Sequence, residues 1–129
     1  MITLDLYAEI ILDHYKNPHH RGILENPTIF AEDSNPLCGD KIRMDIQIDS
    51  NGTISDVAFS GEGCAISQAS ASMLTDEVIG KSLAEVASMR NEQVYEMLQV
   101  TLTPARVKCA LLSLVVLKKA IVLHNISKQ

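Results

Sequence analysis

The sequence predicts an α+β fold: an N-terminal helix, a small antiparallel β-sheet of about three strands, and then several helices packed on one face of the sheet. Hydrophobic residues recur with helical spacing near the N-terminus. Two later segments alternate between apolar and polar residues on either side of a turn. Helix start signals then recur through the C-terminal half. With 129 residues and no internal repeat, the chain is expected to form a single domain, residues 1–129.

The first predicted helix spans residues 4–16, where Leu4, Tyr7 and Ile11 share one face. Pro18 ends this helix, because the residue before a proline avoids the helical conformation. A turn-rich linker follows, and an extended segment is expected around residues 28–33.

The clearest strand signal is the alternation of apolar residues between Lys41 and Asp49. Residues 49–52 read Asp-Ser-Asn-Gly, and the Asn-Gly pair can adopt the positive φ angles of a hairpin turn. The partner strand is expected over residues 53–60. Ile54 is out of phase with the apolar residues that follow it, which predicts a β-bulge.

The C-terminal half predicts helices with recognisable boundaries. Gly80 is typical of the residue just after a helix, Ser82 and Glu85 have the spacing of a capping box, and Thr103 with Pro104 is typical of a helix start. The helices are expected over residues 65–79, 83–89, 91–98 and 104–125.

The last helix is apolar almost all round. One stripe is expected to face the sheet, and apolar residues on the opposite arc indicate a second buried contact, such as a partner or another subunit. The stripe consists of Ala105, Cys109, Leu112, Val116, Ala120 and Leu123, and the opposite arc carries Leu111, Val115 and Val122.

Composition narrows the class of protein. The formal net charge of −5 argues against binding to nucleic acid or to an anionic membrane, because both need a basic surface. No apolar run is expected to approach the length of a membrane span, and the N-terminus lacks the basic region and cleavage site of a signal peptide. These features predict a cytoplasmic protein.

Three cysteines, Cys38, Cys64 and Cys109, stand out because an odd number argues against a disulfide framework. Cys64 lies at a glycine-rich junction between a strand and a helix, where free N–H groups favour a thiolate. Three thiols and the nearby Asp40 make four ligands, the number that tetrahedral zinc or a small iron–sulfur cluster needs. From spacing alone the alternative stays open that the cysteines are small buried residues and that Asp40 caps a turn.

The histidines are weaker candidates for metal ligands. His19 and His20 are adjacent on a loop, and such histidines are more often solvated than ligating. His14 continues the apolar face of the first helix and is expected to pack against the core.

Three motifs give the chain a family resemblance: "NPLCGDKI", "GEGCAISQASASMLTDEVIGKS" and "RVKCALL". In order and placement they resemble the three cysteine motifs of the IscU/SufU/NifU N-terminal family, and the opening "LDLYAEIILDHYKNPHHRG" is similar to that family's first helix and loop. The resemblance covers Leu4 to Ile121. It implies that Cys38, Asp40, Cys64 and Cys109 form a site for zinc or a transient 2Fe–2S cluster, which receives sulfur from a cysteine desulfurase.

The chain departs from parts of the family pattern. IscU-type members have a histidine where this chain has Lys108, and "LTPARVKC" replaces their chaperone-recognition motif. The third motif resembles the SufU branch, in which the arginine at position 106 helps to tune the site. The spacing between Cys64 and Cys109 is short, as in IscU.

The resemblance therefore implies an iron–sulfur cluster assembly protein that accepts sulfur and supports 2Fe–2S cluster formation and transfer. Expected partners are a cysteine desulfurase and apo iron–sulfur proteins or cluster carriers. Cys109 is predicted to accept the sulfur, with Arg106 nearby, and Asp40 is predicted to be the most easily displaced ligand because a carboxylate matches soft metals poorly. Two alternatives remain: a zinc-dependent SufU-type sulfurtransferase that activates its desulfurase without holding a cluster, and a closed structural zinc module.

Overall fold

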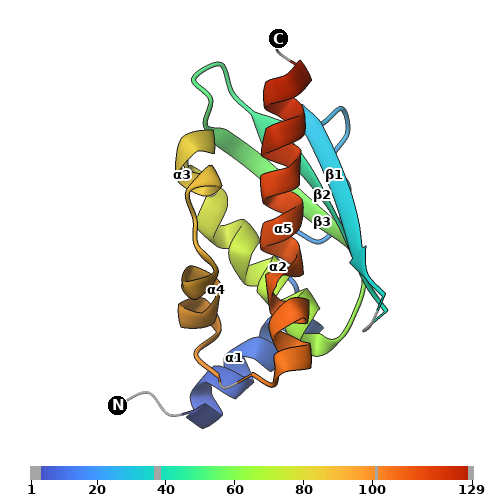
Figure 1. Cartoon of the computed structure of the whole chain (residues 1–129), viewed down its shortest axis with the longest axis vertical. Coiled ribbons are helices and arrows are strands. Elements are labelled where there is room, and N and C mark those ends of the chain that lie inside the picture. Colours follow the sequence, from blue (N-terminus) through green and yellow to red (C-terminus); the bar gives the residue numbers. More distant parts are fainter. Residues whose placement is uncertain (1–3, 37–38, 101, 128–129) are drawn as a thin grey trace.

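A computed structural model describes residues 4–36, 39–100 and 102–127, with side chains placed from residue 8 onward (Figure 1). The predicted fold class is confirmed: one helix, a three-stranded antiparallel sheet, and then further helices. The elements are α1 (Leu4–Lys16), β1 (Ile29–Asn35), β2 (Asp40–Ile48), β3 (Ile54–Glu62), α2 (Ala65–Val78), α3 (Leu83–Ala87), α4 (Asn91–Leu98) and α5 (Pro104–Ser127).

The sheet has the order β1-β2-β3 and follows the predicted alternation. Ile42, Met44 and Ile46 of β2 are all fully buried on one face, where the helices cover them. The pairing of β2 with β3 shifts register between Gln47 and Ile48, because Ser55 is an extra residue on β3, so the bulge predicted from Ile54 is present next to it.

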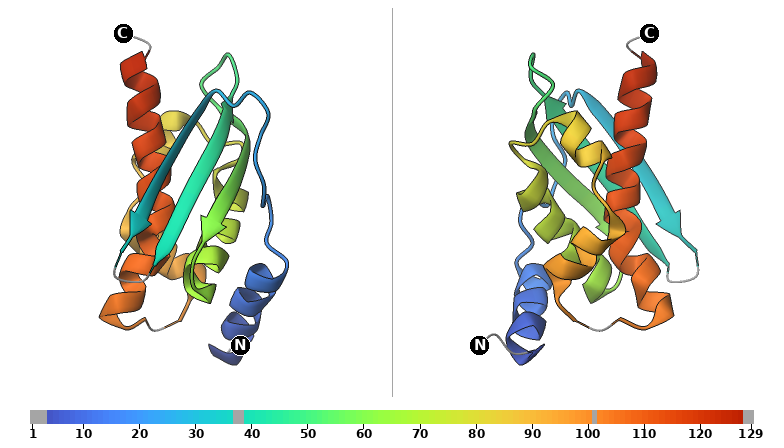
Figure 2. Two further views of the ribbon diagram at one scale, coloured as in Figure 1. Left: turned by 90° about the vertical axis from the view of Figure 1, so that its right-hand side faces the viewer. Right: turned by 60° about the vertical axis from the view of Figure 1, so that its left-hand side comes forward.

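The helices pack on one face of the sheet (Figures 1 and 2). The long helix α5 lies against β1 and β2, α2 contacts β3 and α5, and α1 packs against α2. The capping box predicted at the start of α3 is present. The Ser82 hydroxyl accepts a hydrogen bond from the Glu85 N–H, and the Glu85 carboxylate accepts one from the Ser82 N–H.

The predicted stripe on α5 is largely buried, although its two ends are not. Cys109, Leu112, Val116 and Ala120 lie in the core, whereas Ala105 and Leu123 are exposed. The expectation that no apolar run approaches the length of a membrane span is wrong, since by length and composition alone α5 could cross a membrane. More than half of its most apolar window is buried inside the fold.

The topology brings the ends of several helices and strands together at one end of the molecule. The start of β2, the end of β3, and the N-terminal ends of α2 and α5 all lie there, near α1 (Figures 1 and 2). The sequence places its cysteines in or next to these segments.

Candidate metal centre

The structure brings together three of the four predicted ligands. Asp40 is the first residue of β2, Cys64 precedes α2, and Cys109 lies in the second turn of α5. One ligand atom from each of these residues lies within 4.8 Å of the other two. The fourth predicted ligand, Cys38, lies outside the described residues.

Asp40 has the surroundings of a metal ligand. Its side chain is only 1% exposed, and its Oδ1 accepts a hydrogen bond of 3.0 Å from the backbone N–H of Cys64. Its Oδ2 is buried and accepts no hydrogen bond from any described residue. Burying a carboxylate oxygen without a partner costs free energy, so this atom is suited to bind a cation.

Gly63 is required for this approach of Asp40 to Cys64. A Cβ atom built on Gly63 would lie 2.7 Å from Asp40 Oδ1 and would also collide with the hydroxyl of Ser67. Gly61 is needed for a different reason, since its φ is +128° and a side chain there would run into the backbone of Lys41. The glycines of the "GEGC" segment therefore allow the loop to close on the carboxylate.

Cys64 is partly exposed and occupies the N-cap position of α2. Burial raises the pKa of its thiol, and the charge of Asp40 raises it too. Hydrogen bonds from the backbone N–H groups of Ser67 and Ile66, and from the Cys109 thiol, outweigh both effects, so the pKa of Cys64 lies below its ordinary value. A thiolate at this position is thus favoured by the fold itself.

Cys109 is fully buried and its Sγ contacts the backbone oxygen of Ala105 at 3.6 Å. Arg106 lies on the same helix, exposed to solvent and close to both thiols. Mainly through the charge of Cys64, its pKa is raised above the ordinary value. The attraction is mutual, and the guanidinium therefore stabilises negative charge on the sulfur atoms.

An apolar hollow of about 420 Å³ adjoins the centre, bordered by Arg106 and by the first residues of α2. Its wall combines α1, α2 and the segment before α5, and consists of Ala8, Ile11, Leu12, Ala65, Ile66, Val100, Leu102, Thr103 and Arg106.

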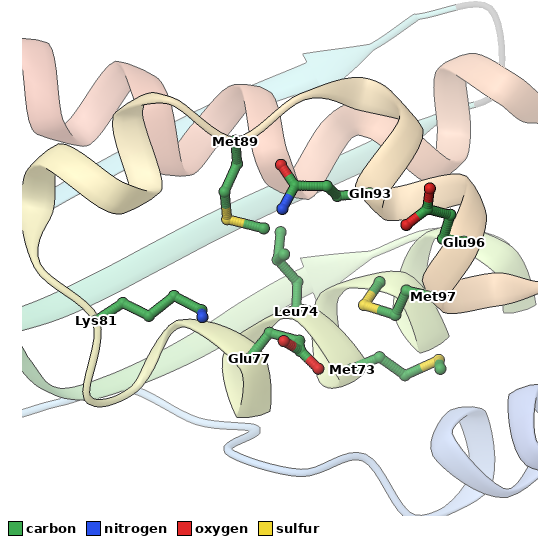
Figure 3. A pocket seen from close by; sticks show the side chains of 8 residues that line it. All are labelled: Met73, Leu74, Glu77, Lys81, Met89, Gln93, Glu96 and Met97. Carbon is green, nitrogen blue, oxygen red and sulfur yellow. The ribbon is translucent and has the colours of Figure 1, made fainter.

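A second pocket, of about 440 Å³, lies between α2 and the α3–α4 region (Figure 3). Met73, Met89 and Met97 line it together with Glu77 and Lys81, and its described lining contains no cysteine. This pocket is separate from the thiols and has no part in the metal centre.

One supporting residue of the centre was missed from the sequence. Arg21 donates one hydrogen bond to Gln68 of α2 and one to the backbone oxygen of Gly61, at 2.9 and 3.0 Å. It thereby ties the loop after α1 to the glycine-rich segment that carries Cys64. No local pattern around Arg21 indicates this role, because its partners lie far away in the sequence.

The donor set fits the groups predicted for it. Two thiolates would suit zinc or iron, and the buried Oδ2 of Asp40, which has no partner among the described residues, could supply a third ligand atom. These features define a class: a small α+β domain with two cysteines and a buried aspartate that could bind a metal at one end.

The chain belongs to the family of NifU-like N-terminal domains, whose family model matches residues 6–129. It is similar to the zinc-dependent sulfurtransferase SufU of Bacillus subtilis (strain 168), with 39% identity covering 90% of this chain and 89% of SufU. It is also similar to the iron–sulfur cluster assembly scaffold protein IscU of Haemophilus influenzae, with 38% identity covering 89% of this chain and 92% of IscU.

A solved structure supports the same fold. It is that of a protein from Fervidobacterium islandicum AW-1 described as a candidate iron–sulfur cluster assembly scaffold for the SUF system. The TM-score is 0.78 at 31% identity, over 88% of this chain and 94% of the other.

Proposed function

We propose that this chain is an iron–sulfur cluster assembly protein, formed as one NifU-N/IscU-like domain over residues 1–129, which accepts sulfur and supports the formation and transfer of a 2Fe–2S cluster. The observation that carries the proposal is the convergence of Asp40, Cys64 and Cys109 at one end of the fold, where one buried oxygen of Asp40 has no hydrogen-bond partner among the described residues. Cys38 is proposed as the fourth ligand. The relatives named scaffold proteins support this assignment.

The proposed sulfur donor is a cysteine desulfurase that carries a persulfide. A thiolate of this chain attacks the outer sulfur of that persulfide, the S–S bond breaks, and the desulfurase cysteine leaves as a thiolate. Arg106 stabilises the attacking thiolate through its positive charge. The apolar hollow beside Arg106 is our proposed contact surface for the desulfurase.

Cys109 remains the acceptor proposed from the sequence, and the structure introduces Cys64 as a competitor. Cys109 is fully buried, whereas Cys64 is partly exposed and has a lowered thiol pKa. Trapping the persulfide and locating it by mass spectrometry distinguishes the two. A persulfide on Cys64 in a Cys109→Ser variant that still accepts sulfur at the normal rate would exclude Cys109 as the first acceptor.

A second candidate function is that of a zinc-dependent sulfurtransferase which activates its desulfurase and holds no cluster. The SufU-like Arg106, the presence of Lys108 in place of a histidine, and the identity to SufU favour it. Bound zinc would keep the thiolates deprotonated at neutral pH.

The decisive experiment uses protein purified without oxygen and then supplied with ferrous iron, cysteine and a desulfurase. A scaffold gains visible absorption, iron and acid-labile sulfide, and passes the cluster to an apo iron–sulfur protein. A sulfurtransferase retains zinc and accelerates its desulfurase instead. Zinc without either activity would leave only a structural zinc module, and would refute both proposals.

Matched aspartate variants test the ligand assignment. Asp40→Ala should change metal content or cluster lifetime, because the displaceable ligand is gone. Asp56→Ala, an exposed position on β3, should behave like the wild type. We further propose that the protein acts in the cytoplasm, where cluster carriers and apo iron–sulfur proteins would receive its product.

A further inference from the structure

A second group of metal-ligating side chains lies away from the cysteines. His14 belongs to the last turn of α1, His19 and His20 to the loop that follows, and Asp76 to α2. One donor atom each from His14, His19 and Asp76 lies within 4.8 Å of the other two. As the sequence predicts, His19 and His20 are exposed, whereas His14 is only half-buried and not part of the core. His14 and His19 nevertheless lie beside the same carboxylate.

The contacts within the group are short. The imidazole rings of His14 and His19 are 4.5 Å apart, centre to centre. The Nδ1 of His19 lies 2.6 Å from Asp76 Oδ2, and the Nδ1 of His14 lies 2.7 Å from the hydroxyl of Ser72. Two imidazoles and a carboxylate therefore meet over one turn of α2.

We propose that His14, His19 and Asp76 form a second metal site, which binds a divalent first-row transition-metal ion such as zinc. Imidazole and carboxylate are ligands of this class of ion, and three protein ligands leave one position for water or an external ligand. Ligand atoms about 2.0–2.2 Å from a tetrahedral ion lie roughly 3.3–3.6 Å apart. The three donor atoms already lie within 4.8 Å of one another, so they must approach each other by at most about 1.5 Å.

The backbone around the site holds the ligands in place. The backbone N–H of His19 donates to Ser72 Oγ at 2.7 Å, and the loop pairs with β3 through His20 and Gly22, which both bond to the backbone of Phe59. Asp76 lies in the last turn of α2. Because the three ligands come from fixed segments, little ordering is needed when the ion binds.

His20 supports the carboxylate without belonging to the triad. Its Nδ1 lies 3.0 Å from Thr75 Oγ1 and 3.3 Å from Asp76 Oδ1, so it orients the second oxygen of the carboxylate.

The second site is distinct from the thiolate centre. Asp76 lies about 18 Å beyond Cys64 along α2, at roughly 1.5 Å per residue. It also offers nitrogen and oxygen atoms in place of sulfur. Metal binding at the second site can therefore be measured in a variant without cysteines. The proposal of this site does not depend on the function proposed above.

The test uses the full chain with Cys38, Cys64 and Cys109 replaced by serine, titrated with zinc chloride and followed by calorimetry and X-ray absorption. We expect one zinc ion per chain, with a coordination shell of nitrogen and oxygen only. His19→Ala in this background should weaken binding by at least about tenfold. The control is Glu92→Ala, which removes an exposed carboxylate on α4 and should leave the affinity close to that of the parent.

A second measurement covers the case in which the serine variant does not fold. In the wild-type chain already holding one equivalent of zinc, a second equivalent should shift the ring ¹⁵N resonances of His14 and His19. The proposal is overturned if the folded serine variant binds no zinc, or if His19→Ala and Glu92→Ala weaken binding equally. It is also overturned if the second equivalent leaves both histidine rings unchanged.

Discussion

Replacing Gly63 with alanine tests how closely Asp40 is held to the cysteines. The added Cβ would lie 2.7 Å from Asp40 Oδ1, whereas an ordinary van der Waals contact of a Cβ atom begins at 3.4 Å. The carboxylate must then move by about 0.7 Å. That displacement exceeds the tolerance of about 0.2 Å for a metal–ligand distance, and it weakens the hydrogen bond from the Cys64 N–H.

Two measurements follow from this displacement. Overpacking should lower the free energy of unfolding of the metal-free protein by about 1–3 kcal/mol, measured in urea. Zinc affinity, measured with a competing chelator, should fall by at least about tenfold, because one ligand is no longer in position. Adding Ser67→Ala to Gly63→Ala removes the second collision and should recover part of the stability but not the zinc affinity.

The matched control is Gly80→Ala. Gly80 has a φ of +93°, and a Cβ there would meet no atom within 4 Å. This change should therefore cost about 1–2 kcal/mol through backbone strain alone and leave zinc affinity unchanged. Wild-type zinc affinity in Gly63→Ala would refute the placement of Asp40 in the metal centre.

Further predictions concern the capping box, the charge at the centre and the core. Ser82→Ala should lower the free energy of unfolding in urea by about 1 kcal/mol. The Ser82 backbone N–H, followed by its hydroxyl, holds the pKa of Glu85 below its ordinary value of 4.5. The unfolded state therefore binds more protons, and this contribution to stability, complete above pH 4.5, is lost as the pH falls through the lower folded-state pKa. An NMR titration of the Glu85 carboxyl carbon should show a midpoint below 4.5. Arg106→Ala should raise the thiol pKa of Cys64 in metal-free protein, so that alkylation requires a higher pH. Leu74→Ala should cost about 2–5 kcal/mol in the same urea assay, since Leu74 is fully buried.

Each of these predictions has a control. Ser55→Ala removes an exposed hydroxyl outside any helix cap, and a loss of stability equal to that of Ser82→Ala would contradict the capping argument. The Glu85 titration should return toward 4.5 in Ser82→Ala. If Arg90→Ala shifts the pH dependence of Cys64 alkylation as much as Arg106→Ala does, the thiol pKa depends on the net charge of the protein and not on the proximity of Arg106. Leu12→Ala, at a side chain 47% exposed, should cost far less than Leu74→Ala.

The elements of this fold follow from local patterns in the chain. Apolar alternation placed β2, the mismatch at Ile54 located the bulge, and the serine–glutamate spacing located the cap of α3. These features depend on neighbours a few residues apart, so the sequence carries them directly. The cysteine motifs likewise indicated both the family and the ligands proposed for its metal centre.

Tertiary structure alone decided what those elements bring together. It set Asp40 Oδ1 against the N–H of Cys64, left its other oxygen without a described partner, and showed why Gly63 must have no side chain. It also placed His14, which was expected to pack in the core, and the exposed His19 beside the carboxylate of Asp76. Local periodicity cannot specify such contacts, because they join segments far apart in the chain whose spacing is fixed only when helices and sheet pack together.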